Sequence, residues 1–166
     1  NSLHVSWILR ALESGKHVLC EKPLGLTVAD AALAFQLADR RGLLLVEGIW
    51  YRWHPRTRRA EQLLATGSMG LPLSVHAEFS FAGVPHANYR RDPTLGGGAL
   101  LDVGCYTLSA VQWSLPGPFR VMAAELVPHV DGVDTSAVAT IEAASGQAQV
   151  RASIDAAERQ SLLITC

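Results

Sequence analysis

The stretch "HVLCEKPLGLTVADAALAFQLADRRGLLLVEGI", His17 to Ile49, decides the fold. It begins with a short apolar strand pattern, "HVLCE", and ends with a second one, "LLLVEGI". Thr27, with Asp30 three residues later, resembles a capping box that carries Asp in place of Glu or Gln. It opens an Ala/Leu-rich helix that reaches about Arg41 and is closed by Gly42. Strand, helix and strand in this order, with an apolar second strand, predict parallel strands covered by helices.

Another helix is predicted just before this stretch, in "LHVSWILRALESGK" at residues 3–16. Its apolar residues recur at helical spacing, and Gly15 supplies a stop signal. These elements together look like the tail of a doubly wound α/β domain, which we assign to residues 1–54.

The pattern changes after a predicted helix from Pro55 to Ala65. Alternating or apolar runs of strand length follow, with turn signals at Gly132 and at Ser145–Gly146, the second being a hairpin signal. These runs are "LSVHAEFSF", "RVMAAELV", "SAVATIEA", "QAQVRASIDA" and "QSLLITC". Consecutive strands at hairpin spacing predict a mainly antiparallel sheet. We therefore expect an α+β domain over residues 55–166, truncated at its C-terminus.

The composition excludes several classes of protein. The chain has 166 residues, of which 49% are hydrophobic and 17% charged, and this favours a globular protein over a disordered one. The net charge of −1 argues against nucleic acid as a partner. No apolar run approaches the roughly 20 residues of a membrane span. Three cysteines without C-x-x-C spacing and scattered histidines indicate neither a disulfide framework nor a metal site. A reducing, cytoplasmic location is expected.

The segment "GGGALLDVGCY", Gly96 to Tyr106, raises a question of chemistry. A buried helix is predicted from about Gly97 to Trp113, with Asp102 and Tyr106 at i and i+4 on one face. A buried carboxylate is costly unless it is paired. Asp102 could satisfy backbone donors and the helix dipole while Tyr106 fills the core, or the two could belong to a site. The glycines could form a flexible entry loop, or they could let the backbone approach a ligand closely.

A second candidate lies in "CEKP", Cys20 to Pro23, where a strand runs into a charged pair and a proline. Ligands bind at the carboxyl ends of strands in open α/β sheets, so Lys22 is placed to reach a cleft. The alternative is a solvated lysine at the rim of the sheet.

Four segments carry a resemblance to a known family: "NSLH", "ALESGKHVLCEKPLGLT", "EGIWYRWHP" and "RRDPTLGGGALLDVGCYTLS". Together they resemble the glucose–fructose oxidoreductase/inositol dehydrogenase (Gfo/Idh/MocA) family of NAD(P)-dependent oxidoreductases. The resemblance runs from Asn1 to Ser109, and the strands up to Cys166 suit the second domain of that family. Tyr106, the last residue of a D-x-G-x-Y motif, resembles the branch of dihydrodiol dehydrogenase and D-xylose dehydrogenase, although glucose–fructose oxidoreductase also has tyrosine there.

The resemblance implies hydride transfer between NAD or NADP and a CH–OH group of a sugar, polyol or dihydrodiol. Residues 1–54 would then be the C-terminal portion of a Rossmann NAD(P)-binding domain, and residues 55–166 a substrate and oligomerisation domain. Tyr106 would be the general acid/base, and the Lys22 ammonium would lower its pKa and polarise the substrate oxygen. Asp102 would orient Lys22 or a sugar hydroxyl.

Further positions are weighed beside these. Two arginines ahead of the glycines, Arg90 and Arg91, could meet a substrate or a phosphate, but we expect solvated loop positions. For Trp50 and Trp53, core packing is favoured over a role facing the substrate. The residues assigned to cofactor binding are Asn1, His4, Glu21, Lys22, Pro23 and Arg52.

One expected part is missing. The G-x-G-x-x-G loop that binds pyrophosphate would lie before Asn1, so a fragment is expected that neither binds dinucleotide tightly nor turns over. The full-length protein is expected to be a homodimer or homotetramer. Two alternatives stay open: a non-catalytic, truncated family member that acts as a binding or interaction module, and an enzyme of the inositol or glucose–fructose type.

Overall fold

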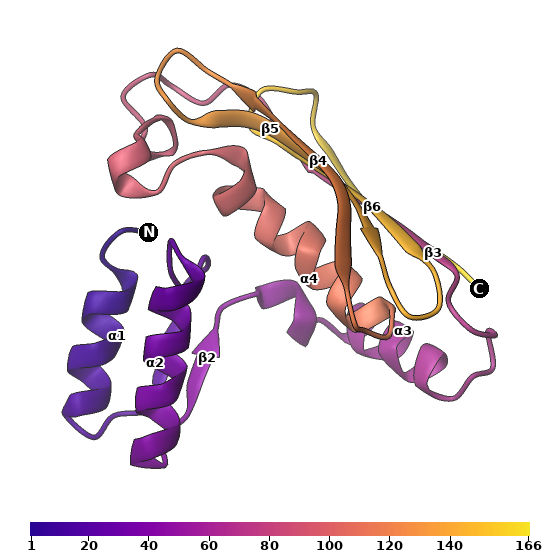
Figure 1. Ribbon diagram of the computed structural model, residues 1–166, viewed down its shortest axis with the longest axis horizontal. Helices are drawn as coiled ribbons and strands as arrows, with labels where there is room; N and C mark the ends of the chain where they lie inside the picture. The colour runs from indigo at the N-terminus through magenta and orange to yellow at the C-terminus, as the bar shows by residue number, and fades with distance from the viewer.

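The computed structural model describes residues 1–166, which form a helical end and a sheet (Figure 1). The first part of the chain folds as predicted, into two helices that lie side by side and two short strands that pair in parallel. Thr27 caps the second helix by accepting a hydrogen bond from the amide of Asp30 at 3.1 Å, and Gly42 ends it with a φ of 63°. The elements are α1 (His4–Glu13), β1 (Val18–Cys20), α2 (Val28–Arg41) and β2 (Leu45–Glu47).

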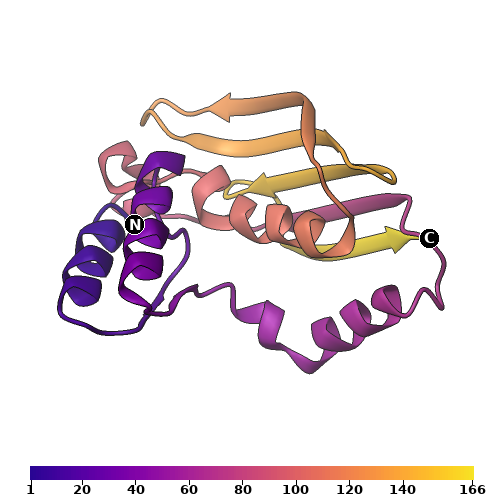
Figure 2. The ribbon, with the colours of Figure 1, turned by 60° about the horizontal axis from the view of Figure 1, so that its bottom comes forward.

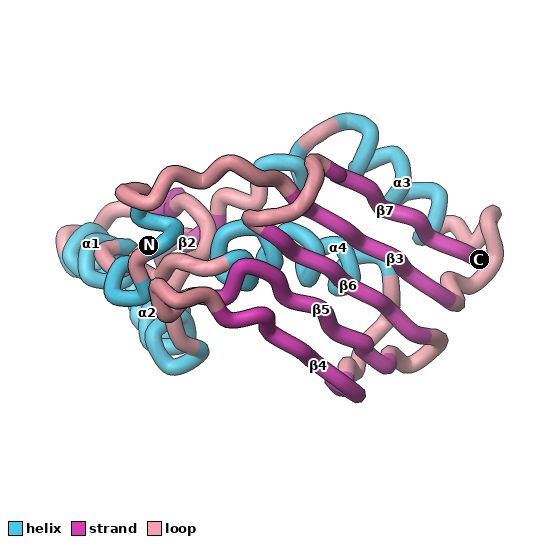
Figure 3. The backbone as a smooth tube through the Cα atoms, turned by 90° about the horizontal axis from the view of Figure 1, so that it is seen from above, coloured by secondary structure: helices cyan, strands magenta, loops and turns pink.

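The second part is a five-stranded sheet in the order β4-β5-β6-β3-β7 (Figure 3). Every neighbouring pair is antiparallel except β3 and β6, which are parallel. The predicted mainly antiparallel α+β fold is therefore confirmed. Before the sheet come the short helix η1 (Trp50–Trp53) and α3 (Pro55–Ala65). The strands are β3 (Ser74–Ser80), β4 (Arg120–Pro128), β5 (Asp134–Glu142), β6 (Gln147–Ser153) and β7 (Arg159–Thr165).

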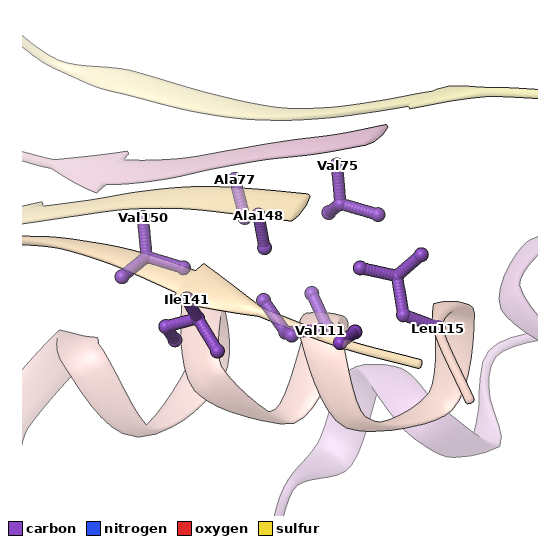
Figure 4. Close-up of a cluster of buried hydrophobic side chains, with 9 residues drawn as sticks. Val75, Ala77, Val111, Leu115, Ile141, Ala148 and Val150 are labelled. Carbon is purple, nitrogen blue, oxygen red and sulfur yellow. The ribbon is translucent and has the colours of Figure 1, made fainter. Parts of the chain in front are cut away.

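The main core lies between this sheet and α4 (Cys105–Ser114), which runs along one face of the sheet (Figures 2 and 3). Alternate residues of the strands point toward the helix, as the period of two requires. Val75 and Val150 from the sheet meet Val111 of the helix and Leu115, which directly follows it (Figure 4). A smaller core joins α1 to α2 around Leu12. None of the helices is long and apolar enough to cross a membrane.

The helix predicted from Gly97 begins later than expected. Gly98 has a φ of +104° and lies outside it, and a π-helical turn, η4 (Leu100–Gly104), precedes α4. The cause is a residue distant in sequence: Asp134 of β5 accepts a hydrogen bond from the amide of Leu100 at 2.7 Å. A Cβ on Gly98 would collide with that carboxylate. The glycines therefore allow a close approach of the chain to itself.

Candidate active site

Lys22 and Asp102 meet where the two parts of the molecule touch. Lys22 follows β1, and its ammonium donates to the Oδ1 of Asp102 at 2.9 Å and to the backbone oxygen of Asp102 at 2.5 Å. The same ammonium lies 5.2 Å from the ring centroid of Tyr106, in the first turn of α4. The structure thus brings together the three residues that the sequence proposed as catalytic, although they come from separate elements.

The carboxylate of Asp102 is buried, with 1% of the residue exposed, and it has a second cationic partner. Arg90 donates from its Nε to the Oδ2 of Asp102 at 2.6 Å. The expectation that Arg90 is a solvated loop residue is wrong, because its guanidinium is half-buried and lies 4.7 Å from the ring centroid of Tyr89. A pair twelve residues apart fits no local helix or strand spacing, so no sequence period could have found it.

Asp102 keeps Lys22 in its charged form. Burial alone would lower the pKa of Lys22, but the hydrogen bond and the negative charge of Asp102 outweigh it, so the pKa is raised. A carboxylate that faces a buried ammonium is no longer an unpaired charge, which answers the question raised by the acid in this helix.

Tyr106 does not follow the expectation fully. Burial raises the pKa of its phenol, and the Lys22 ammonium acts in the opposite direction without compensating for it. The sequence prediction was therefore right about the direction of the effect of Lys22 and wrong about the net shift. The phenol is protonated at neutral pH. Its ring packs against Phe79, at 5.4 Å between centroids.

The residues proposed for cofactor binding divide into two groups. Asn1 donates to the oxygen of Gly96 at 2.7 Å, and a ring nitrogen of His4 lies 2.7 Å from the oxygen of Pro23. The His4 contact and the buried Pro23 support the segment that carries Lys22, whereas the Asn1 contact reaches the glycine segment. Glu21, in the same segment, is exposed.

Arg52 is placed differently. It forms an ion pair with Glu61 of α3, and its guanidinium lies 5.9 Å from the ring centroid of Trp113. None of these contacts involves the catalytic candidates, so Arg52 braces η1 against α3 and α4 in this structure.

Sequence reasoning also missed Tyr51 and Glu47. The hydroxyl of Tyr51 accepts a hydrogen bond from Trp113 at 3.0 Å and lies 3.3 Å from the backbone oxygen of Tyr106. Glu47 accepts from the amide of Leu24 at 2.7 Å, just after the proline. Tyr51 and Glu47 therefore hold the backbone near the site in place. Neither residue belongs to a pattern that marks it in the sequence.

Tyr106 lines a cavity of about 560 Å³ between α3, α4 and the β3–β7 edge of the sheet. Its aromatic lining includes Trp50, which is 60% exposed, so the expected core packing of Trp50 is wrong. The core packing expected for Trp53 is wrong as well, since that residue is 61% exposed and lies beneath Arg58. A larger hollow of about 780 Å³ lies over the sheet and includes none of the catalytic candidates. No group of three or more His, Cys, Asp or Glu side chains is arranged to hold a metal ion.

The thiols around the site should differ in reactivity. Cys105 lies between Asp102 and Tyr106 in sequence, and burial is the main cause that raises its pKa to about 12. Since the thiolate is the reactive form, we expect iodoacetamide at pH 8 to modify the exposed Cys166 readily and to leave Cys105 unmodified. Mass spectrometry of the peptides measures this, and unfolding in urea should make Cys105 reactive. Equal rates for the two thiols in the folded chain would contradict the burial of Cys105.

Comparisons with known proteins agree with this geometry. A family model described as the GFO/IDH/MocA C-terminal domain matches residues 57–166, and one described as the oxidoreductase family, NAD-binding Rossmann fold, matches residues 1–49. The chain is 41% identical over 162 residues to D-xylose 1-dehydrogenase (NADP(+)) 2 of Haloferax volcanii, covering 96% of this chain and 50% of that protein. It is 33% identical over 145 residues to trans-1,2-dihydrobenzene-1,2-diol dehydrogenase of Bos taurus, covering 86% of this chain and 43% of that protein.

Solved structures give the same result. A 3-ketoreductase from Actinomadura kijaniata, in complex with NADP and TDP-benzene, superposes with a TM-score of 0.89 at 33% identity, over 99% of this chain and 51% of that one. The expected resemblance to D-xylose and dihydrodiol dehydrogenases is confirmed. The chain spans about half the length of the curated relatives it matches.

Proposed function

This chain belongs to the Gfo/Idh/MocA family of oxidoreductases, and we propose on that premise that it forms the catalytic centre of an NAD(P)-dependent dehydrogenase or ketoreductase. The substrate carries a CH–OH or carbonyl group on a sugar, polyol or dihydrodiol. The observation that supports this most is the position of Lys22, which is hydrogen-bonded to Asp102 and lies beside the ring of Tyr106.

The hydrogen-bond donors Lys22 and Tyr106 suit the nicotinamide ring of such a cofactor and the substrate oxygen beside it. NAD(P), when bound, supplies or accepts the hydride at the nicotinamide ring. Tyr106 gives the proton to the substrate oxygen during reduction, since its hydroxyl is protonated near neutral pH, and its phenolate takes the proton from the alcohol during oxidation. Lys22 has three N–H donors and gives two to Asp102, so the third is free to polarise that oxygen. Asp102 holds the ammonium in place and does not itself transfer the proton.

The proposed cofactor contacts come from the segment around Lys22. Glu21 and Pro23 follow β1, at the kind of strand end where nucleotides bind in open α/β sheets, and His4 at the start of α1 contacts Pro23. Asn1, just before α1, is retained as a candidate beside them. We retain Arg52 as a weaker candidate, since its pair with Glu61 would have to open. Residues 1–54 would serve the nucleotide and residues 55–166 the substrate.

The cavity lined by Tyr106 is proposed as the substrate pocket. It offers aromatic faces from Trp50 and Phe79 together with polar groups such as Thr107. Sugars and cyclic diols present apolar CH faces to aromatic rings and hydroxyls to polar groups, which fits this mixture.

Assembly and location complete the proposal. We expect the complete protein to be a homodimer or homotetramer in the cytoplasm, where the three free cysteines of this chain would stay reduced. The large hollow over the sheet, away from the site, is available as a contact between copies. The mass in solution, measured by light scattering, tests this part independently of activity.

Cofactor binding tests the central claim. NADH and NADPH are titrated by fluorescence into the 166-residue chain and into the complete gene product that contains it. We expect the complete product to bind at least one of them and to oxidise or reduce sugars, and the 166-residue chain alone to bind weakly. A folded complete product that binds neither nucleotide would instead support a non-catalytic binding module.

A further inference from the structure

The two oxygens of Asp102 are divided between two cations. Oδ1 accepts from Lys22 at 2.9 Å, and Oδ2 accepts from Arg90 at 2.6 Å. We propose that Arg90 is a positioning residue of the reaction, which holds Asp102 so that the carboxylate presents one oxygen to Lys22 and keeps the ammonium beside Tyr106. This inference rests on the proposed function, because it concerns the same reaction.

Arg90 is itself held at several points. Its amide donates to the side chain of Asn88 at 3.0 Å, and its backbone oxygen accepts from the amide of Gly98 at 3.0 Å. A Cβ on Gly97 would lie 2.5 Å from that oxygen, so the glycines permit this close approach. The guanidinium lies 4.7 Å from the ring centroid of Tyr89. A guanidinium in solvent would make neither the contact with the Tyr89 ring nor the hydrogen bond to Asp102.

These contacts join Arg90 to the helix that carries Asp102. The backbone oxygen of Arg90 is hydrogen-bonded to Gly98, two residues before η4 begins. The side chain of Arg90 is hydrogen-bonded to Asp102 within η4. The carboxylate is therefore fixed at both oxygens. If Arg90 were absent, Oδ2 of Asp102 would be left as a buried acceptor without a donor, which is costly. The carboxylate would then rotate until both of its oxygens faced Lys22.

The division of charge has a second consequence. Two cations around one buried carboxylate leave a net positive charge beside Tyr106, which favours the phenolate that must form when an alcohol is oxidised. Without Arg90, the whole negative charge of Asp102 would be compensated by Lys22 alone. The positioning of the ammonium and the charge near the phenol would change together.

The test compares Arg90→Gln and Arg90→Lys with the neighbouring Arg91→Gln as a matched control, since Arg91 faces Asp131 at 4.0 Å and not Asp102. In the complete gene product, we expect Arg90→Gln to lower kcat by about 10- to 100-fold with little change in KM for NAD(P)H. Arg90→Lys should restore part of this loss because it keeps the charge. The pH profile of alcohol oxidation should move to higher pH in Arg90→Gln and stay unchanged in Arg91→Gln.

A second readout needs no turnover. The 166-residue chain contains only two lysines, Lys16 and Lys22, so labelling with [13Cε]lysine gives two NMR signals. In Arg90→Gln we expect the titration midpoint of Lys22 to rise for two reasons. The Asp102 carboxylate then pairs with Lys22 alone, and the positive charge of Arg90 no longer disfavours the charged form of Lys22. The exposed Lys16 is the internal reference. Arg90→Met, which also removes the charge and adds no lysine signal, serves if Arg90→Gln does not fold.

The outcomes separate the two claims. An unchanged Lys22 midpoint and unchanged kcat in the Arg90 variants, with Tyr106→Phe inactive, would overturn the role of Arg90 and leave the proposed function standing. Full activity of Tyr106→Phe would overturn only the acid/base role of Tyr106, whereas a folded complete product that binds neither NADH nor NADPH would overturn the proposed function itself. Equal losses in the Arg90 and Arg91 variants would reduce Arg90 to a loop-stabilising residue and so also overturn the inference.

Discussion

Replacement of Tyr106 by phenylalanine is expected to lower kcat for both oxidation and reduction by about 10²- to 10⁴-fold in the complete gene product. The phenol belongs to the ring beside Lys22 and can exchange a proton with the substrate oxygen, whereas the Asp102 carboxylate is already held by Lys22 and Arg90. Phenylalanine keeps the ring that packs against Phe79, so the fold should be unaffected. Steady-state kinetics measures the loss, and circular dichroism verifies the fold.

The matched control is Tyr89→Phe, because the hydroxyl of Tyr89 makes no hydrogen bond in the structure and its ring beneath Arg90 is retained. This variant should keep full activity. A loss below about threefold in Tyr106→Phe would mean that the proton comes from elsewhere, since even weak general acid catalysis contributes more.

The raised pKa of Tyr106 sets the pH dependence. Oxidation needs the phenolate, whose population grows as the pH approaches a pKa that burial holds above its usual value, so the oxidation rate should rise with pH well into the alkaline range. Reduction uses the protonated phenol and should persist until that group ionises. An oxidation rate that reaches its plateau below pH 7 would show that another base acts.

Removal of the Asp102 carboxylate should produce the largest loss of stability. In Asp102→Ala, the charged groups of Lys22 and Arg90 lose their shared partner inside the protein, and breaking a buried pair costs about 3–5 kcal/mol. Urea unfolding followed by circular dichroism measures the change in the free energy of unfolding. The expected shift is a large fraction of the stability of a domain of this size.

A matched control is Glu142→Ala, which breaks the exposed pair of Glu142 with Arg120 on β5 and β4. Surface ion pairs contribute about 0–1 kcal/mol, so the free energy of unfolding of this variant should be close to that of the unsubstituted protein. If Asp102→Ala were no less stable than Glu142→Ala, the carboxylate would not compensate buried charge, and the geometry argued for the site would be wrong.

The elements themselves were largely predictable, because they depend on short-range patterns. The helix capped by Thr27 and closed by Gly42, and the hairpin at Ser145–Gly146, each rest on a few adjacent residues. The partners of β3 were not predictable, since alternation shows that a strand has two faces and does not say which strands lie beside it. The late start of α4 depends on Asp134, far along the chain.

The site was predictable where a compact motif marked it and unpredictable where contacts cross the fold. Lys22, Asp102 and Tyr106 stand in recognisable segments. Arg90 and Tyr51 do not, and their importance appears only once the glycine segment and η1 are placed in space. The net shift in the pKa of Tyr106 was misjudged because a sequence names the nearby cation but does not measure the burial that opposes it.

The place of β3 inside the sheet has a consequence for synthesis on the ribosome. β3 is complete at Ser80, but its neighbours begin only at Gln147 and Arg159. At ~5–20 residues per second, the nascent chain carries this inner strand unpaired for about 3–13 s before the first neighbour begins to be made. During that interval Val75 has no sheet to pack in, and β3 is open to pairing with other nascent chains. A chaperone that binds unfolded chains would act during this interval, and its removal should lower the soluble yield.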